Sequence, residues 1–160
     1  MATLKVTITE SVTINGKDMG GTYSGFSNAS ITQVEKRIVN ATTTETTLYD
    51  AANATADVED NIEGGAAWDD DSVKYVRITN LDTDATKSVI LVLANSDNDV
   101  FLYKLYGMQS FLLWNHNGAF HANEGGATAI GNVQSITKVT VQAISATQAV
   151  ELFIGSTDAA

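Results

Sequence analysis

The sequence predicts an all-β protein, folded as a β-sandwich and most simply as a jelly roll. Three observations support this: short runs of β-branched and aromatic residues, turn residues that recur roughly every 8 to 12 positions, and almost no helical periodicity. The runs are clearest at residues 74–81, 88–95 and 100–106, which acidic or Asn-rich turns join. About eight or nine short strands are expected.

A single domain is expected over residues 1–160. A globular chain of 160 residues buries roughly 68–70% of the surface that it exposes when unfolded, which is enough for a hydrophobic core. The sequence contains no cysteine, so this core has to hold without disulfides.

Residues 1–16 are expected to form a strand or extended arm that ends in a tight turn. Leu4, Val6 and Ile8 share one parity and polar residues separate them, a period of two that is typical of a half-buried strand. Asn15-Gly16 then favours a two-residue hairpin turn, where the chain should fold back. Because an unpaired strand edge can add to a neighbour's sheet, Leu4, Val6 and Ile8 are interface candidates.

The next stretch of the chain carries weaker signals. Gly20, Gly21 and Gly25 interrupt the returning strand and indicate bulges or a loop. Residues 31–49 are β-branched and Thr-rich, which favours two strands. Residues 51–71 are rich in Ala, Asp and Asn, and they are expected to form an acidic loop or a short helix inserted into the sandwich.

The second half of the chain has the clearest strands. Residues 89–93 are apolar on both faces, as in a central or interface strand. Alternation resumes at residues 100–106 and 111–114, and again at 138–142 and 150–154. The sequence has no proline, a residue that often prevents an exposed sheet edge from pairing with another chain, so such edges have to be covered in another way. Pairing with a neighbouring subunit is one such way, which is the first indication of an oligomer.

The charge of the chain excludes some classes of partner. A formal net charge of −10 at pH 7 repels phosphate backbones and anionic lipids, so neither nucleic acid nor a membrane surface is an expected partner. The start of the chain lacks the features of a secretory signal, and no run approaches the roughly 18 apolar residues of a membrane span. We expect the protein to be made and kept in a reducing cytosol until it is released.

Neither a catalytic site nor a cofactor is expected. The sequence has no cysteine and no Gly-x-Ser-x-Gly elbow, and neither histidine has a recognisable serine partner. Gly125-Gly126 lacks the later Lys and Ser or Thr of a phosphate-binding loop. His116 and His121 are too far apart along the chain to serve one metal ion from a single strand, and a metal site needs a full ligand set.

One cluster of acidic residues is a candidate calcium site. Asp69, Asp70 and Asp71 supply the oxygen ligands that calcium prefers, although this region lacks the spacing of an EF-hand loop. Paired acids in turns usually cap the backbone instead, and that role is expected for the remaining pairs, Asp82 with Asp84 and Asp97 with Asp99.

The aromatic residues gather in one part of the chain. Half of them fall between positions 101 and 120, and interfaces concentrate aromatic residues at their buried centres. Phe101, Phe111 and Phe120 are expected to fill the core. The remaining three, Tyr103, Tyr106 and Trp114, are interface candidates because their hydroxyl or indole N–H groups can face water at the edge of an interface.

Several stretches of the sequence resemble small virion structural proteins of tailed bacteriophages, especially marine ones. They are residues 6–17 with the Asn-Gly-Lys turn, 35–39 (EKRIV), 74–82 (KYVRITNLD) and 150–157 (VELFIGST). The resemblance spans most of the chain, apart from the acidic segment 57–71. It implies a β-sandwich within a virus particle, commonly as capsid decoration or cement, and less often in a tail or fibre.

Two functions follow from these observations. The first is a capsid decoration protein that self-associates, with a homotrimer favoured, and stabilises the phage head by binding the major capsid protein. Such a protein resides in the virion after assembly in the host cytoplasm. The alternative is a tail or fibre β-sandwich that binds a glycan or receptor, with Trp114 and residues 115–117 as a stacking platform and polar rim.

Overall fold

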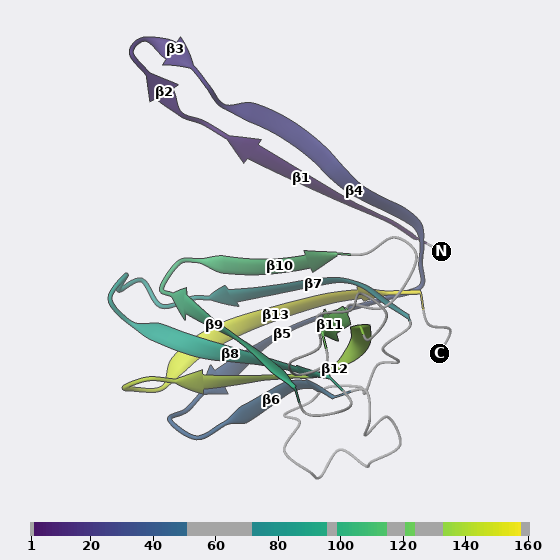
Figure 1. Ribbon diagram of the computed structural model, residues 1–160, viewed down its shortest axis with the longest axis vertical. Helices are drawn as coiled ribbons and strands as arrows, with labels where there is room; N and C mark the ends of the chain where they lie inside the picture. Colours follow the sequence, from purple (N-terminus) through teal and green to yellow (C-terminus); the bar gives the residue numbers. More distant parts are fainter. Residues whose placement is uncertain (1, 51–71, 96–98, 115–120, 124–132, 158–160) are drawn as a thin grey trace.

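The computed structural model describes residues 2–50, 72–95, 99–114, 121–123 and 133–157, and every regular element among them is a β-strand. The all-β prediction is therefore confirmed (Figure 1). In chain order the strands are β1 (Ala2–Glu10), β2 (Thr13–Ile14), β3 (Lys17–Asp18), β4 (Gly21–Ile31), β5 (Gln33–Ala41), β6 (Thr46–Asp50), β7 (Val73–Asn80), β8 (Ser88–Asn95), β9 (Val100–Tyr106), β10 (Ser110–Trp114), β11 (His121–Asn123), β12 (Val133–Ala143) and β13 (Gln148–Ser156).

The strands from β5 onward form a jelly roll. Their antiparallel pairs are nested: β5 pairs with β13, β6 with β12, β7 with β10, and β8 with β9. Two further pairings, β7 with β13 and β8 with β12, join the nested pairs into two sheets. This is the double Greek key of a jelly roll, so the predicted topology is confirmed.

The two sheets pack face to face around one core. Sheet I has the order β10-β7-β13-β5, and sheet II has the order β11-β12-β8-β9 with β6 also paired to β12. Side chains alternate along the strands, so that Leu91, Ile78 and Leu152 point inward and are fully buried. β8 lies between β12 and β9, as expected of a strand that is apolar on both faces.

Side chains close the two open sides of the sandwich. On one side, the Arg37 guanidinium of β5 donates a hydrogen bond to the backbone oxygen of Leu48 in β6, and so joins sheet I to sheet II. On the other side, the ring of Tyr103 in β9 meets the ring of Phe111 in β10, with centroids 5.0 Å apart. Phe111 packs against the core as predicted, but Phe101 does not, because it lies on the edge strand β9 and is 50% exposed.

The first four strands form a long hairpin, residues 2–31, rather than part of the sandwich. Asn15 and Gly16 have φ angles of 52° and 75°, which match the two-residue turn that the sequence predicts. The register between β1 and β4 shifts between Val6 and Ile8, opposite Gly25. The Tyr23 ring occupies the space in which a Cβ of Gly25 would lie, so this position suits glycine, and the predicted bulge is present.

Candidate interaction surface

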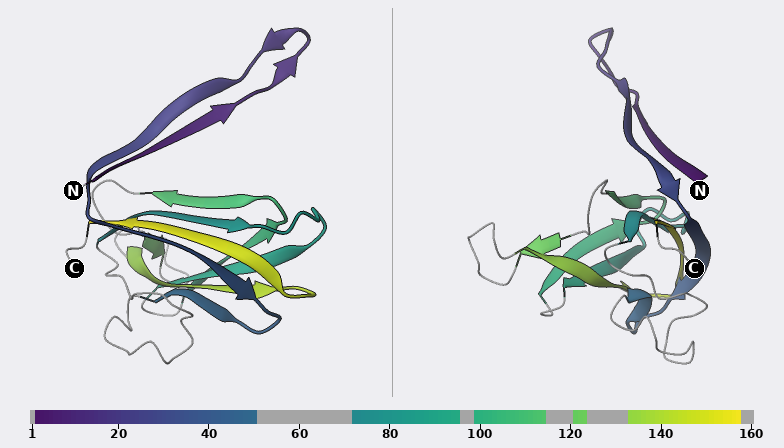
Figure 2. Two further views of the ribbon diagram at one scale, coloured as in Figure 1. Left: turned by 180° about the vertical axis from the view of Figure 1, so that it is seen from behind. Right: turned by 90° about the vertical axis from the view of Figure 1, so that its right-hand side faces the viewer.

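The hairpin leaves the sandwich at one end and diverges from it. Figures 1 and 2 show that its base lies beside the ends of β7 and β13, whereas its tip stands clear of both sheets. Within the described part of the chain, β1 and β4 pair only with each other. A two-stranded hairpin is marginally stable at best in water, so a further surface is needed to hold it in one conformation.

The base of the hairpin is fixed by an apolar contact with the outer face of sheet I. The Phe26 ring of β4 stacks on the Tyr75 ring of β7, with centroids 6.0 Å apart, and Tyr75 in turn meets Phe153 edge-on at 5.8 Å. The Leu4 side chain of the hairpin approaches Gly155 of β13, where an added Cβ would lie only 3.0 Å from it. Glycine at this position therefore allows the hairpin to lie close to the sheet. Phe26 is 1% exposed, which makes it the anchor of the hairpin.

The apolar face of the hairpin continues beyond this anchor. Opposite residues of an antiparallel pair share a face, and Val6 pairs with Phe26 while Ile8 pairs with Tyr23. Leu4, Val6 and Ile8, predicted as interface residues, therefore lie on the anchoring face and are half-buried. Further from the base, the exposed apolar side chains are Val12, Ile14, Met19 and Tyr23.

A charged cluster occupies the centre of the outer face of sheet I. The Glu151 carboxylate of β13 accepts one ion pair from Lys36 at 3.0 Å and another from Arg77 at 2.5 Å. Arg77 also lies over the Phe153 ring, 5.5 Å from its centroid. The Lys36 ammonium, followed by the Arg77 guanidinium, holds the pKa of Glu151 below its usual range. This face is consequently polar at its centre and aromatic where the hairpin is anchored.

The other interface candidates lie on two adjoining edge strands. Tyr103 and Tyr106 belong to β9 and are each 38% exposed. Trp114 ends β10, where it pairs with Tyr75 and is half-buried. Trp114 therefore shares the face of sheet I to which the hairpin is anchored, while the two tyrosines lie at the edge of sheet II. The structure brings these six candidates onto two separate surfaces, the hairpin base and the β9 edge.

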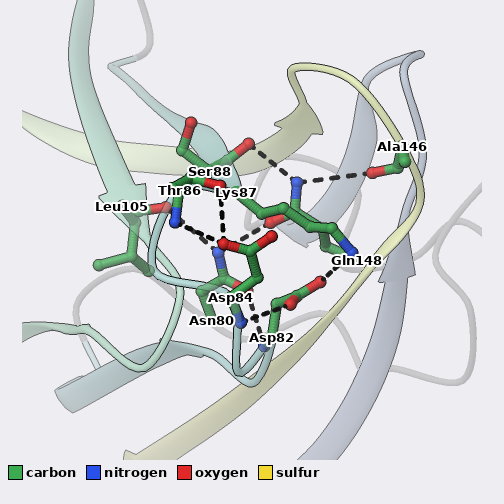
Figure 3. A network of polar contacts seen from close by, with 9 residues as sticks. All are labelled: Asn80, Asp82, Asp84, Thr86, Lys87, Ser88, Leu105, Ala146 and Gln148. Atoms are coloured by element: carbon green, nitrogen blue, oxygen red, sulfur yellow. Dashed lines mark hydrogen bonds and ion pairs between the residues drawn. The ribbon is translucent and has the colours of Figure 1, made fainter.

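The turn between β7 and β8 is built by a ladder of side-chain caps (Figure 3). Asp82 accepts a hydrogen bond from the amide of Asp84 at 2.9 Å, and Asp84 accepts one from the amide of Thr86 at 2.9 Å. The amide of Asp84, followed by the Lys87 ammonium, lowers the pKa of Asp82, and the Thr86 hydroxyl, followed by the Thr86 amide, lowers the pKa of Asp84. The predicted capping role of Asp82 and Asp84 is confirmed, and their carboxylates are occupied by the turn.

A buried amide pair lies beneath this turn. Asn80 of β7 donates to the Gln148 side-chain oxygen at 2.9 Å, and Gln148 donates to the backbone oxygen of Ser88 at 3.0 Å (Figure 3). Asn80 also accepts from the amide of Asp82 at 3.1 Å. These bonds join both sheets through β7, β8 and β13. Sequence reasoning missed the pair, because isolated Asn and Gln residues at strand ends resemble ordinary turn residues.

Sequence reasoning also missed the anchor residues Phe26 and Tyr75. One signal was available for the first, since Phe26 is a large apolar residue between Gly25 and Ser27 in a stretch of mostly small residues. No comparable signal marks Tyr75, because its burial on the outer face of sheet I depends on a hairpin distant in sequence.

Several predicted features lie outside the described residues. One is the acidic segment 51–71, with the calcium candidates Asp69, Asp70 and Asp71. The others are the capping candidate Asp97, the core candidate Phe120, and residues 115–117 of the glycan platform, which include His116. Within the described ranges, no group of three or more His, Cys, Asp or Glu side chains could hold a metal ion. The same ranges contain no helix long and apolar enough to cross a membrane.

The chain matches no protein-family model, and comparison with curated proteins and with solved structures finds no significant similarity.

Proposed function

We propose that this protein is a structural component of a virus particle, a capsid decoration protein that binds the major capsid protein and stabilises the phage head. The proposed place in a virus particle rests on the resemblance of its sequence to small virion structural proteins. The observation that carries the proposal is the hairpin: a long two-stranded element, anchored at one end by Phe26, whose apolar residues continue beyond the anchor into solvent.

The hairpin supports a docking role for energetic reasons. Covering exposed apolar side chains with another protein lowers the free energy of the complex. A strand added to an unpaired edge also satisfies main-chain hydrogen bonds. The jelly roll behind the hairpin is closed by its own side chains at Arg37 and Phe111, so it serves as a rigid body that presents the hairpin. Many copies on one shell raise the effective concentration at each contact, so modest individual affinities suffice.

A binding experiment with the purified chain tests this proposal. The triple variant Val12→Ser, Ile14→Ser, Met19→Ser removes apolar side chains that are at least 44% exposed, so folding should be unaffected. On phage heads stripped of decoration, we expect the wild-type chain to co-sediment and the variant to bind at least about tenfold more weakly, about 1.4 kcal/mol or more.

The matched control is Ile144→Ser, an apolar residue that is 52% exposed on the turn between β12 and β13, far along the chain from the hairpin. This control should bind as the wild type does. Equal binding of all three proteins, or a chain absent from purified particles, would contradict the proposal. A copy number close to that of the major capsid protein supports a shell position, whereas a copy number equal to that of a tail fibre contradicts it.

A further inference from the structure

The exposed edges of the jelly roll are protected unequally. On the edge strand β5, Arg37 and Glu35 point inward and form an ion pair at 3.0 Å, a device that discourages pairing with another chain. The edge strand β6 is short and faces a register irregularity at Val139 and Thr140. β10 is also short, and four of its five residues are half-buried.

β9 has none of these protections. It pairs with β8 over its whole length without a register irregularity, and no other described strand pairs with its free edge. Its first three residues, Val100, Phe101 and Leu102, are 58%, 50% and 59% exposed. Its one charged residue is Lys104, whose ammonium lies 4.8 Å from the centroid of the Tyr106 ring. A long, regular and apolar edge of this kind is a site at which another strand adds.

We infer that β9 is the self-association surface of this protein, where it pairs antiparallel with β9 of a second copy about a two-fold axis at Tyr103. This surface is separate from the hairpin on which the proposed function depends. The pairing would join sheet II of the two copies into one continuous sheet. A two-fold contact is isologous and closes at a dimer, the commonest form of homo-oligomer, and not at the homotrimer expected from the sequence.

The charge of β9 is compatible with a second copy at this edge. Each copy has a formal net charge of −10, so two copies repel wherever their acidic residues meet. Residues 100–106 contain no acid and one lysine, so two paired β9 strands place none of their own carboxylates opposite one another.

Lys104 and Phe101 favour a register with its axis at Tyr103 over one with its axis at Lys104. With the axis at Tyr103, Lys104 of each copy lies opposite Leu102 of the other, whereas an axis at Lys104 would place two lysines directly opposite, which is destabilising. The chosen register also sets Phe101 opposite Leu105. Half-exposed Phe101 would thereby gain cover from the second copy, and the Tyr103 residues of the two copies would lie opposite one another at the axis.

Disulfide cross-linking tests the axis, because the chain has no cysteine of its own. Tyr103→Cys should form a covalent dimer under mild oxidation. Tyr106→Cys is the matched control, since Tyr106 is equally exposed on the same strand but would lie opposite Val100. Selective cross-linking of the first variant supports the inference. Equal cross-linking of both variants, or of neither, overturns it.

Charge substitutions at Leu102 provide a second test in sedimentation equilibrium. Leu102→Lys would place lysines opposite one another and should weaken the dimer by at least about tenfold. Leu102→Glu would face Lys104 twice and should strengthen the dimer, although it makes each copy more acidic. The opposite order, or a monomer for every variant, contradicts the inference.

The triple variant Val12→Ser, Ile14→Ser, Met19→Ser in the full chain separates this inference from the proposed function. Its dimer should persist, because β9 is intact, while its binding to phage heads should be weakened. Loss of the dimer in this variant would instead identify the hairpin as the self-association element and overturn the role of β9. Failure of the head-binding experiment alone would leave the β9 dimer standing.

Discussion

The ring of Phe26 in the hairpin stacks on the ring of Tyr75 in β7, with the two planes inclined by 28°. This contact joins an element that begins at residue 2 to a sheet that begins at residue 33, and it sets the direction in which the hairpin leaves the sandwich. Its disruption should therefore free the hairpin without unfolding the jelly roll.

Phe26→Ala tests this separation. Truncation of a buried phenylalanine costs about 3–5 kcal/mol, and we expect this cost to fall on hairpin docking because Phe26 lies outside the core cluster of the sandwich. Hydrogen exchange should become faster in β1 and β4 and remain slow in β8 and β13. Met19→Ala, at a position 64% exposed near the hairpin tip, is the control and should leave the exchange rates of β1 and β4 unchanged. Faster exchange throughout the sandwich would show that the hairpin is part of the cooperative core.

Asn80→Ala should destabilise the jelly roll itself. The substitution leaves the buried Gln148 oxygen without its Asn80 donor and the Asp82 amide without its acceptor, for a loss of about 1–3 kcal/mol. Urea unfolding measures the change in free energy. Asn40→Ala, on the exposed face of β5, should change it by less than about 0.5 kcal/mol. An equal effect of the two substitutions would contradict a structural role for the buried amide pair.

Arg37→Leu should also destabilise the fold, because it removes the bond from β5 to Leu48 and the ion-pair partner of the Glu35 carboxylate. A loss of up to about 3 kcal/mol is expected, since both side chains are largely removed from solvent. Adding Glu35→Leu should recover part of this loss by removing the carboxylate as well. Thermal unfolding of the single and double variants checks both statements. A double variant less stable than Arg37→Leu would refute them.

Acid should destabilise the protein through three carboxyl groups. The pKa values of Glu151, Asp82 and Asp84 are lower in the folded state than their ordinary values. These groups therefore contribute stability that is complete above the ordinary carboxyl range, roughly pH 5, and is lost as pH falls through the lower folded pKa values.

Unfolding free energy measured against pH should accordingly be flat near neutrality and decline below about pH 5. Glu151→Gln removes one of the three groups, so its curve should decline less steeply in the acid range. An identical pH dependence for the wild type and Glu151→Gln would exclude a contribution from the Lys36–Glu151–Arg77 cluster.

The strands and the first turn were predictable because their signals are local. A period of two marks β1, β9 and β13, and Asn15-Gly16 takes the positive φ angles that the pair favours. The two-sided apolar pattern of residues 89–93 indicated a central strand for the same reason. The wrong expectation concerned Phe101, since its sequence pattern is that of an inward-facing residue but β9 lies at a sheet edge, where inward-facing side chains are left partly open.

The sequence by itself determined that this chain is built of strands, that it folds back at Asn15-Gly16, and that Leu4, Val6 and Ile8 share one face. Only the tertiary structure decided which strands are edges, that Phe26 anchors the hairpin on Tyr75, and that Asn80 and Gln148 meet in the interior. The physical reason is the range of the interactions. Side-chain alternation and turn geometry act between near neighbours in the chain, whereas pairing and burial depend on residues that are dozens of positions apart.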